Sequence, residues 1–128
     1  MRMVAILAAF LMTGTVVTSA SAASLNGTWS GSGYVQPREG NRESVRCRVT
    51  YDRQSSRVYG VRATCASSSN SIRQTGEVLM IRSNLFAGDF YNPQFDIGGR
   101  IRITVSGSIQ TVTFSGRGVT GQLTLRKR

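Results

Sequence analysis

The residue types that most often carry catalysis are scarce in this chain. It contains no histidine, so no imidazole can act as a base or a metal ligand, and no serine lies in a Gly-x-Ser-x-Gly turn. Asp89 and Asp96 flank an Asn92-Pro93 turn and could meet as a carboxylate pair for acid–base chemistry. Such residues more often form turns or pair with arginine. The sequence therefore predicts a protein that is not an enzyme and that uses no cofactor or metal ion.

The N-terminal residues have the three parts of a secretory signal. Arg2 supplies a positive charge, Met3 to Met12 is uncharged and apolar, and Ala20-Ser21-Ala22 supplies the small residues that precede a cleavage site. The apolar part is shorter than the roughly 20 residues that span a membrane, and no later segment is apolar enough to span one as a helix. We expect cleavage after Ala22, with Ala23 as the alternative, and export to the periplasm or beyond the cell.

Export changes the interpretation of the two cysteines, Cys47 and Cys65. Both would enter an oxidising compartment, where a single disulfide is the default for a small domain. Cleavage after Ala22 leaves residues 23–128, which is 106 residues and one domain. A domain of this size has a modest core, so a covalent link would help. Closing a separation of 18 residues would stabilise the fold by about 3 kcal/mol.

The mature segment is strongly basic. Of the 16 lysines and arginines only Arg2 lies in the signal, so 15 remain against 6 acidic residues, and the net charge is +9. All but Lys127 are arginines, whose planar guanidinium makes two-point contacts with carboxylate or phosphate. We therefore expect an anionic partner. A basic surface with no specific site is the alternative.

Alternating apolar and polar residues predict the elements that position these side chains. In the runs 45–51 and 97–105, apolar residues recur at every second position and face a core, while the arginines between them face water. About eight such runs, short turns and no helix-period segment predict an all-β domain, a small antiparallel up-and-down barrel, with a sandwich as the alternative. The outward arginines that are candidate anion contacts are Arg46, Arg48, Arg62, Arg100 and Arg102.

The two cysteines belong to a predicted hairpin, each on an inward face. The segment from Asp52 to Ser56 has turn composition, which centres the hairpin near Gln54. A directly opposed pair of Cys47 and Cys65 instead centres the hairpin near Ser56. A bulge or a longer loop must reconcile the two positions.

Four aromatic residues bracket the Asn92-Pro93 turn and allow two interpretations. In one, Phe86 and Phe90 fill the core and Tyr91 covers the turn. In the other, Tyr91 and Phe95 line the mouth of the barrel and receive a ligand, beside the outward arginines of the next strand. No aromatic residues are interleaved with the arginines on the strand faces, so sequence-specific nucleic-acid binding is not expected.

The segment Leu25-Asn26-Gly27-Thr28-Trp29 resembles the opening of lipocalin-like and avidin-like barrels. That resemblance implies that Gly27 and Trp29 have structural roles and that the tryptophan closes one end of the barrel and packs on the last strands. The other interpretation of Trp29 is a ligand contact. More loosely, the chain resembles small exported proteins of alphaproteobacteria for which no activity is implied.

A second resemblance concerns function. The signal, the Leu-x-Gly-x-Trp segment and the cysteine pair are similar in outline to small periplasmic inhibitors of bacterial metalloproteases. In that family the free N-terminal tail enters the protease cleft, whereas only Ala23 and Ser24 would precede the barrel here. We therefore expect a non-catalytic envelope protein that binds an anionic component through its arginine faces. Protease inhibition is the alternative, and a purely structural envelope role is the third.

One mass measurement tests the signal and the disulfide together. Protein recovered from its native compartment should have the intact mass of residues 23–128 less two hydrogen atoms, and reduction should restore those two hydrogens. An unprocessed N-terminus would contradict the secretory signal. Free thiols in the unreduced sample would contradict the disulfide.

Overall fold

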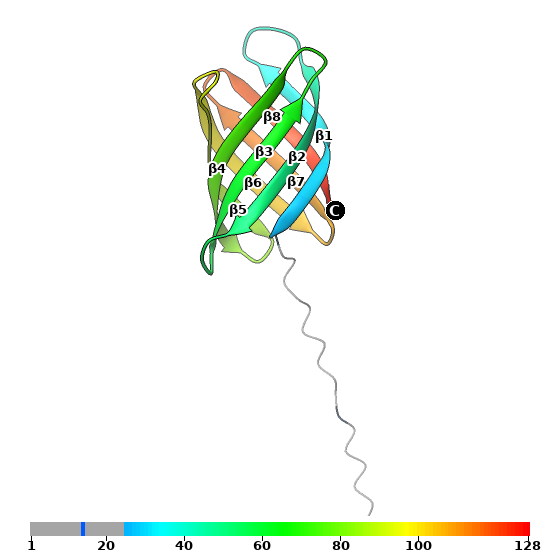
Figure 1. Cartoon of the computed structure of the whole chain (residues 1–128), viewed down its shortest axis with the longest axis vertical. Coiled ribbons are helices and arrows are strands. Elements are labelled where there is room, and N and C mark those ends of the chain that lie inside the picture. Colours follow the sequence, from blue (N-terminus) through cyan, green and yellow to red (C-terminus); the bar gives the residue numbers. More distant parts are fainter. Residues whose placement is uncertain (1–13, 15–24) are drawn as a thin grey trace, which may run out of the picture.

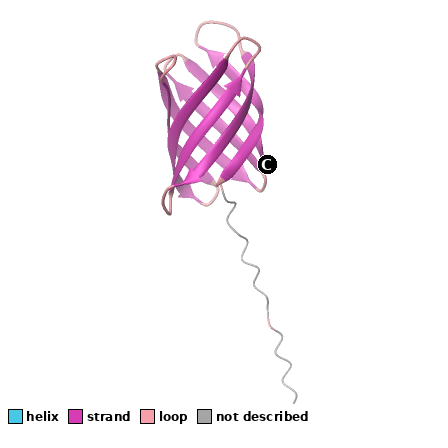
Figure 2. Ribbon diagram, in the orientation of Figure 1, coloured by secondary structure: helices cyan, strands magenta, loops and turns pink. Residues whose placement is uncertain are grey.

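The computed structural model describes Gly14 and residues 25–128, so the expected signal and its cleavage position lie outside the described residues (Figure 1). The described part contains no helix, and hence none that could cross a membrane (Figure 2). It consists of eight strands joined by short loops. They are β1 (Gly27–Pro37), β2 (Glu43–Arg53), β3 (Val58–Ala66), β4 (Ser71–Arg82), β5 (Leu85–Asn92), β6 (Ile97–Ser106), β7 (Ile109–Gly116) and β8 (Val119–Lys127).

The strands form a closed antiparallel barrel. Each strand pairs with the next along the chain, and β1 also pairs with β8. The expected up-and-down barrel is therefore confirmed, and the sandwich alternative is wrong. Gly31 and Gly33 allow the closure, because a Cβ atom at either position would overlap the backbone oxygens of Thr124 and Gln122 on β8. Full closure leaves no edge strand on which other chains could add.

The expected alternation of faces is also confirmed. On β2, alternate residues from Val45 to Tyr51 are buried, whereas Arg46 and Arg48 are exposed. The other expected pair of outward arginines, Arg100 and Arg102 on β6, is exposed as well. Strand geometry explains the pattern, because successive side chains point to opposite faces and only one face can be inside a barrel.

The hairpin of β2 and β3 corrects one expected boundary. Asp52 and Arg53, expected in the turn, continue β2 and pair with β3. The connection is therefore residues 54–57, centred near Ser56 as the opposed cysteine pair requires. Turn composition indicated the wrong centre because the Asp52 carboxylate is used differently: it binds a neighbouring arginine on the outer wall.

Cys47 and Cys65 lie directly opposite each other and form the expected disulfide, with a Cα–Cα distance of 4.1 Å. Cys47 is buried and Cys65 is half-buried, so the bond lies on the inner wall of the barrel. The link joins two strands that are already neighbours, and it fixes their register covalently.

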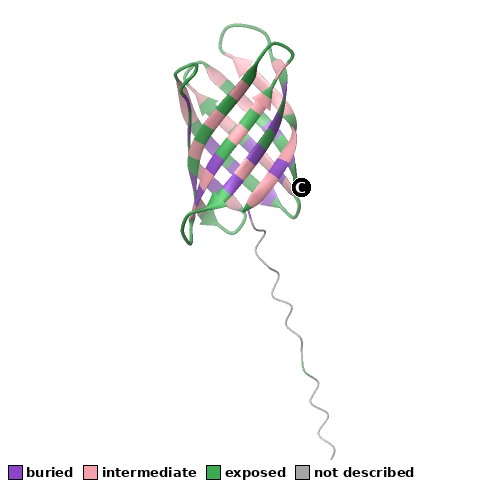
Figure 3. Cartoon of the chain, in the orientation of Figure 1, coloured by how far each residue is buried: buried purple, intermediate pink, exposed green. Residues whose placement is uncertain are grey.

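The barrel wall alternates between buried and more exposed residues (Figure 3). The end at which β1 begins, here called the closed end, is filled by large side chains. Trp29 is fully buried, as expected for a structural tryptophan, and its Nε1 donates a hydrogen bond of 2.9 Å to the carbonyl of Leu25. Tyr51 donates a hydrogen bond of 2.6 Å to Oε1 of buried Gln110, and burial raises the pKa of this tyrosine. Phe86 is also fully buried, and Phe90 is buried, so the core interpretation of these two residues is confirmed.

The disulfide should contribute strongly to stability. A variant with both Cys47→Ala and Cys65→Ala should lose about 3 kcal/mol of unfolding free energy, because the unfolded chain regains the freedom of an 18-residue loop. Urea denaturation measures the loss. Reduced wild-type protein is the control, since it keeps both sulfur atoms and loses only the covalent link. A reduced protein as stable as the oxidised one would contradict the expected contribution.

Candidate ligand-binding site

The opposite end of the barrel, here called the open end, is hollow. Several inward-pointing side chains there, among them Ala63, Ile72 and Phe114, are only half-buried, whereas Trp29 and Tyr51 at the closed end are fully buried. A cavity of about 110 Å³ extends from the loops of this end down to Tyr51, Ile103 and Val112. Most of its wall is apolar and includes Val35, Val45, Ala63, Ile72, Phe114 and Leu123.

The sequence places small inward residues where the cavity forms. β3 contributes Ala63 and Cys65 to the wall. On β4, Gly76 is in the inward phase and pairs with Val61 and Phe90, so no side chain projects inward at that position. The largest side chains of the barrel instead gather at the closed end. Because all eight strands are held at similar spacing by their hydrogen bonds, small residues on several adjacent strands leave a space that their neighbours do not fill.

The mouth of the cavity is polar. It is lined by Glu43 at the start of β2, Ser67 and Asn70 of the β3–β4 loop, and Gln74 of β4. Ser69 of the same loop donates a hydrogen bond of 2.6 Å from its hydroxyl to Oε1 of Glu43. This bond, together with a smaller effect of Ser67, lowers the pKa of the Glu43 carboxyl, which is therefore ionised at neutral pH.

The β3–β4 loop that carries these groups is ordered by its own hydrogen bonds. The Ser67 hydroxyl accepts bonds from the backbone N–H groups of Ser69 and Asn70, at 3.3 and 3.1 Å. The Ser67 N–H in turn donates to the Asn70 carbonyl at 2.8 Å. These contacts hold Ser69 against Glu43 and so fix the carboxylate at the cavity mouth.

A separate hollow lies on the outer wall, where two predicted arginines meet a third. Arg46 and Arg48 of β2 line it together with Arg128, and the floor includes serines of β1. Ser32 lies opposite Arg46 and Ser30 opposite Arg48, so small side chains leave the guanidinium groups uncovered. Arg128 is held by a 2.9 Å hydrogen bond from its Nε to the Ser30 hydroxyl. Neither Arg46 nor Arg48 forms an ion pair with another described residue.

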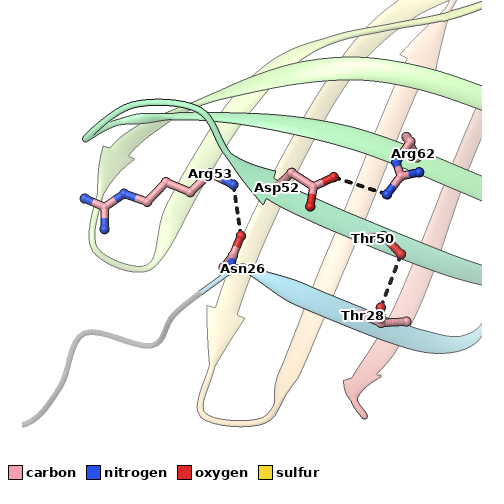
Figure 4. Close-up of polar contacts among 6 residues, drawn as sticks. All are labelled: Asn26, Thr28, Thr50, Asp52, Arg53 and Arg62. Atoms are coloured by element: carbon pink, nitrogen blue, oxygen red, sulfur yellow. Dashed lines mark hydrogen bonds and ion pairs between the residues drawn. The ribbon is translucent and has the colours of Figure 1, made fainter.

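The third predicted arginine of this region, Arg62, is not part of the hollow. Its guanidinium pairs with the Asp52 carboxylate at 3.3 Å, further along the outer wall (Figure 4). Nearby, Asn26 accepts a 2.9 Å bond from the backbone N–H of Arg53. With its charge already paired, Arg62 is less available to an external anion than Arg46 or Arg48.

The remaining predicted site residues lie apart from both places. Arg100 and Arg102 are on β6, which is four strands from β2 around the barrel and so on the opposite wall. Tyr91 and Phe95 are exposed near the open end, and neither is among the residues that line the cavity. The Tyr91 hydroxyl donates a 2.8 Å bond to the Asp96 carboxylate, which raises the pKa of this tyrosine.

The polar mouth was missed from the sequence, although a signal for Glu43 is present. Glu43 is in phase with Val45 and Cys47, so the same alternation that predicts their inward direction also predicts that of the glutamate. Gln74 is likewise in phase with Ile72 and Val78, whereas Ser67 and Asn70 lie in a loop and carry no such signal. Within the described residues, no three histidine, cysteine or acidic side chains are grouped as they would be to hold a metal ion.

Comparisons with known proteins show the fold alone. No protein-family profile matches the chain, and no curated protein sequence matches it. Among solved structures, it is similar to the redesigned β-barrel mFAP1 bound to DFHBI, with a TM-score of 0.70 and 18% identity over 85% of this chain and 100% of that one. It is also similar to a de novo designed fluorescence-activating β-barrel, with a TM-score of 0.65 and 14% identity over 84% of this chain and 96% of that one.

Proposed function

We propose that this chain is a non-catalytic binding protein whose barrel interior takes a small, largely apolar ligand. The cavity carries the proposal, because it has an apolar wall, a few polar groups gathered at its mouth, and access from one end only. This combination is typical of small-molecule sites in β-barrels. The packed closed end keeps the walls rigid, so a ligand would enter a largely preformed space.

The cavity volume limits the size of the ligand. An engineered apolar cavity of about 150 Å³ is large enough to bind benzene or xenon, and the cavity here is about 110 Å³. The part of the ligand inside the barrel is therefore no larger than one small ring or a short alkyl chain. The likeness to mFAP1, which was solved bound to DFHBI, supports the use of this fold for a small molecule.

We also propose that the protein works outside the cytoplasm. The Cys47–Cys65 disulfide agrees with the oxidising compartment expected from the N-terminal sequence. A ligand-binding barrel in the cell envelope would meet small molecules that cross the outer layers of the cell. Protease inhibition stays a prediction, since it depends on Ala23 and Ser24, which lie outside the described residues.

Filling the cavity tests the proposal. Ala63→Phe should abolish binding of toluene, because Ala63 points into the cavity and its side chain is half-buried. Saturable shifts in the methyl NMR signals of Val35, Val45 and Leu123 report binding to the wild-type protein. Ala66→Phe is the matched control: Ala66 is on the same strand but exposed on the outer face, so toluene binding should persist.

Two results would contradict an interior ligand site. One is the absence of saturable shifts in wild-type protein. The other is equal binding of toluene by the two variants, since toluene that still binds when the interior is filled must bind elsewhere. If Ala63→Phe does not give a dispersed spectrum, Ala63→Leu replaces it, with Ala66→Leu as its control.

The arginine hollow supports a second candidate function, recognition of an anionic envelope component. Arg46, Arg48 and Arg128 converge on one shallow surface without a described acidic partner for the first two. Guanidinium groups suit phosphate and carboxylate, and a shallow hollow suits an extended polyanion better than an enclosed small molecule. Such binding would weaken as salt is added, because the contacts are exposed and screened.

Two matched arginine pairs test this second function. Arg46→Gln with Arg48→Gln should weaken binding to heparin and reduce the slope of log affinity against log salt by roughly two. Arg100→Gln with Arg102→Gln removes the same charge at the same spacing from the opposite wall and should have a smaller effect. Equal losses from the two pairs would indicate a diffuse basic surface instead of a site.

A further inference from the structure

The proposed interior site has a charge of its own at the mouth, opposite in sign to the outer wall. Glu43 pairs with Val35 across the β1–β2 ladder, and both side chains line the cavity. It is the one carboxylate among the described residues that line this space. The carboxylate therefore lies where an apolar molecule inside the barrel would present its outermost group.

Glu43 has no arginine partner, although the chain is rich in arginine. It forms no ion pair with another described residue. The guanidinium of its neighbour Arg42 instead lies 3.9 Å from the centre of the Tyr34 ring, and its Nε donates to Gln36 at 3.4 Å. Tyr34 is on the outward face of β1, so this cation does not line the cavity, although Arg42 and Glu43 border one shallow hollow on the outer wall. Arg46, the next arginine along β2, also points outward.

The groups around Glu43 maintain its charge and leave it able to accept more hydrogen bonds. Ser69 donates to Oε1, and a carboxylate can accept about four hydrogen bonds in total. Asn70 and Gln74 add two amide carbonyl oxygens, which can also accept. A ligand group with several N–H donors and a positive charge would satisfy these acceptors, and an ammonium group has both properties.

We propose, on the basis of the proposed interior site, that its ligands are small amphipathic amines. The apolar part, one ring or a short chain, occupies the cavity, and the ammonium group pairs with the Glu43 carboxylate at the mouth. The same geometry disfavours an anionic ligand of equal size, because two negative charges would meet at Glu43. The barrel interior and the arginine hollow thus select ligands of opposite charge.

Four one-ring probes test the proposal by NMR titration of the cavity methyl groups: benzylamine, benzyl alcohol, toluene and benzoate. Wild-type protein should bind benzylamine about fivefold more tightly than benzyl alcohol, which is the factor expected for a favourable half-exposed ion pair. Benzoate should bind most weakly of the four. Toluene binding measures the apolar cavity by itself.

Glu43→Gln should reduce the affinity for benzylamine to that for benzyl alcohol and leave the affinity for toluene unchanged. Glutamine keeps the size of the side chain and still accepts the Ser69 hydrogen bond. Glu39→Gln is the control, because Glu39 is exposed in the β1–β2 loop, does not line the cavity, and loses the same charge when it is replaced. Benzylamine should bind this control as it binds the wild type.

The possible outcomes distinguish the amine proposal from the interior site on which it rests. If toluene binds but benzylamine has no advantage, or if Glu43→Gln binds benzylamine as tightly as the wild type, the amine proposal is wrong and the interior site stands. If none of the four probes binds, both the amine proposal and the proposed interior site are wrong.

Discussion

Pairing of β1 with β8 is the constraint on which the rest of the molecule depends. Once the sheet is closed, every strand has one face inside and one outside, and no side chain can change sides without a shift of register. The positions of Trp29, Cys47 and Glu43 inside, and of the arginines outside, follow from this single topological fact. Gly31 and Gly33 make the closure possible because they let β8 approach β1 closely.

The interior divides into a packed half and a hollow half, and the two have different roles. Trp29, Tyr51 and Phe86 lie at the closed end and are the largest fully buried side chains. At the open end the packing is thinner, and there the Cys47–Cys65 bond lies in the wall of the cavity. A covalent link between neighbouring strands can hold the wall where side-chain packing does not, which allows a cavity in a domain with a small core.

Strand alternation explains how much could be predicted from the sequence. The period of two was sufficient for the strands, their inward faces and the cysteine pair, because these depend on local spacing and on a closed sheet. It was insufficient for the turn after Asp52, where a residue typical of turns instead binds Arg62 on the outer wall. The same alternation indicates that Glu43 points inward, but it does not indicate that the Glu43 carboxylate lies at the mouth of a cavity.

The cavity and the arginine hollow could not be predicted, because both depend on contacts between residues far apart in the sequence. The cavity results from the combined volumes of inward side chains on all eight strands. The hollow joins Arg46 and Arg48 to Arg128, which reaches them only because β8 lies beside β1. Composition predicted the positive charge of the outer wall. It did not predict that Glu43, the one carboxylate among the described residues that line the cavity, would lie at the mouth without an ion pair.

Xenon binding in a crystal of the oxidised mature protein tests the central claim most directly. Xenon occupies apolar cavities without needing a specific polar contact, so it reports the space itself and not the chemistry of one ligand. We expect a xenon atom inside the barrel, between Val45, Ala63 and Phe114. A barrel whose open end is filled by its own side chains, with no xenon inside, would contradict it.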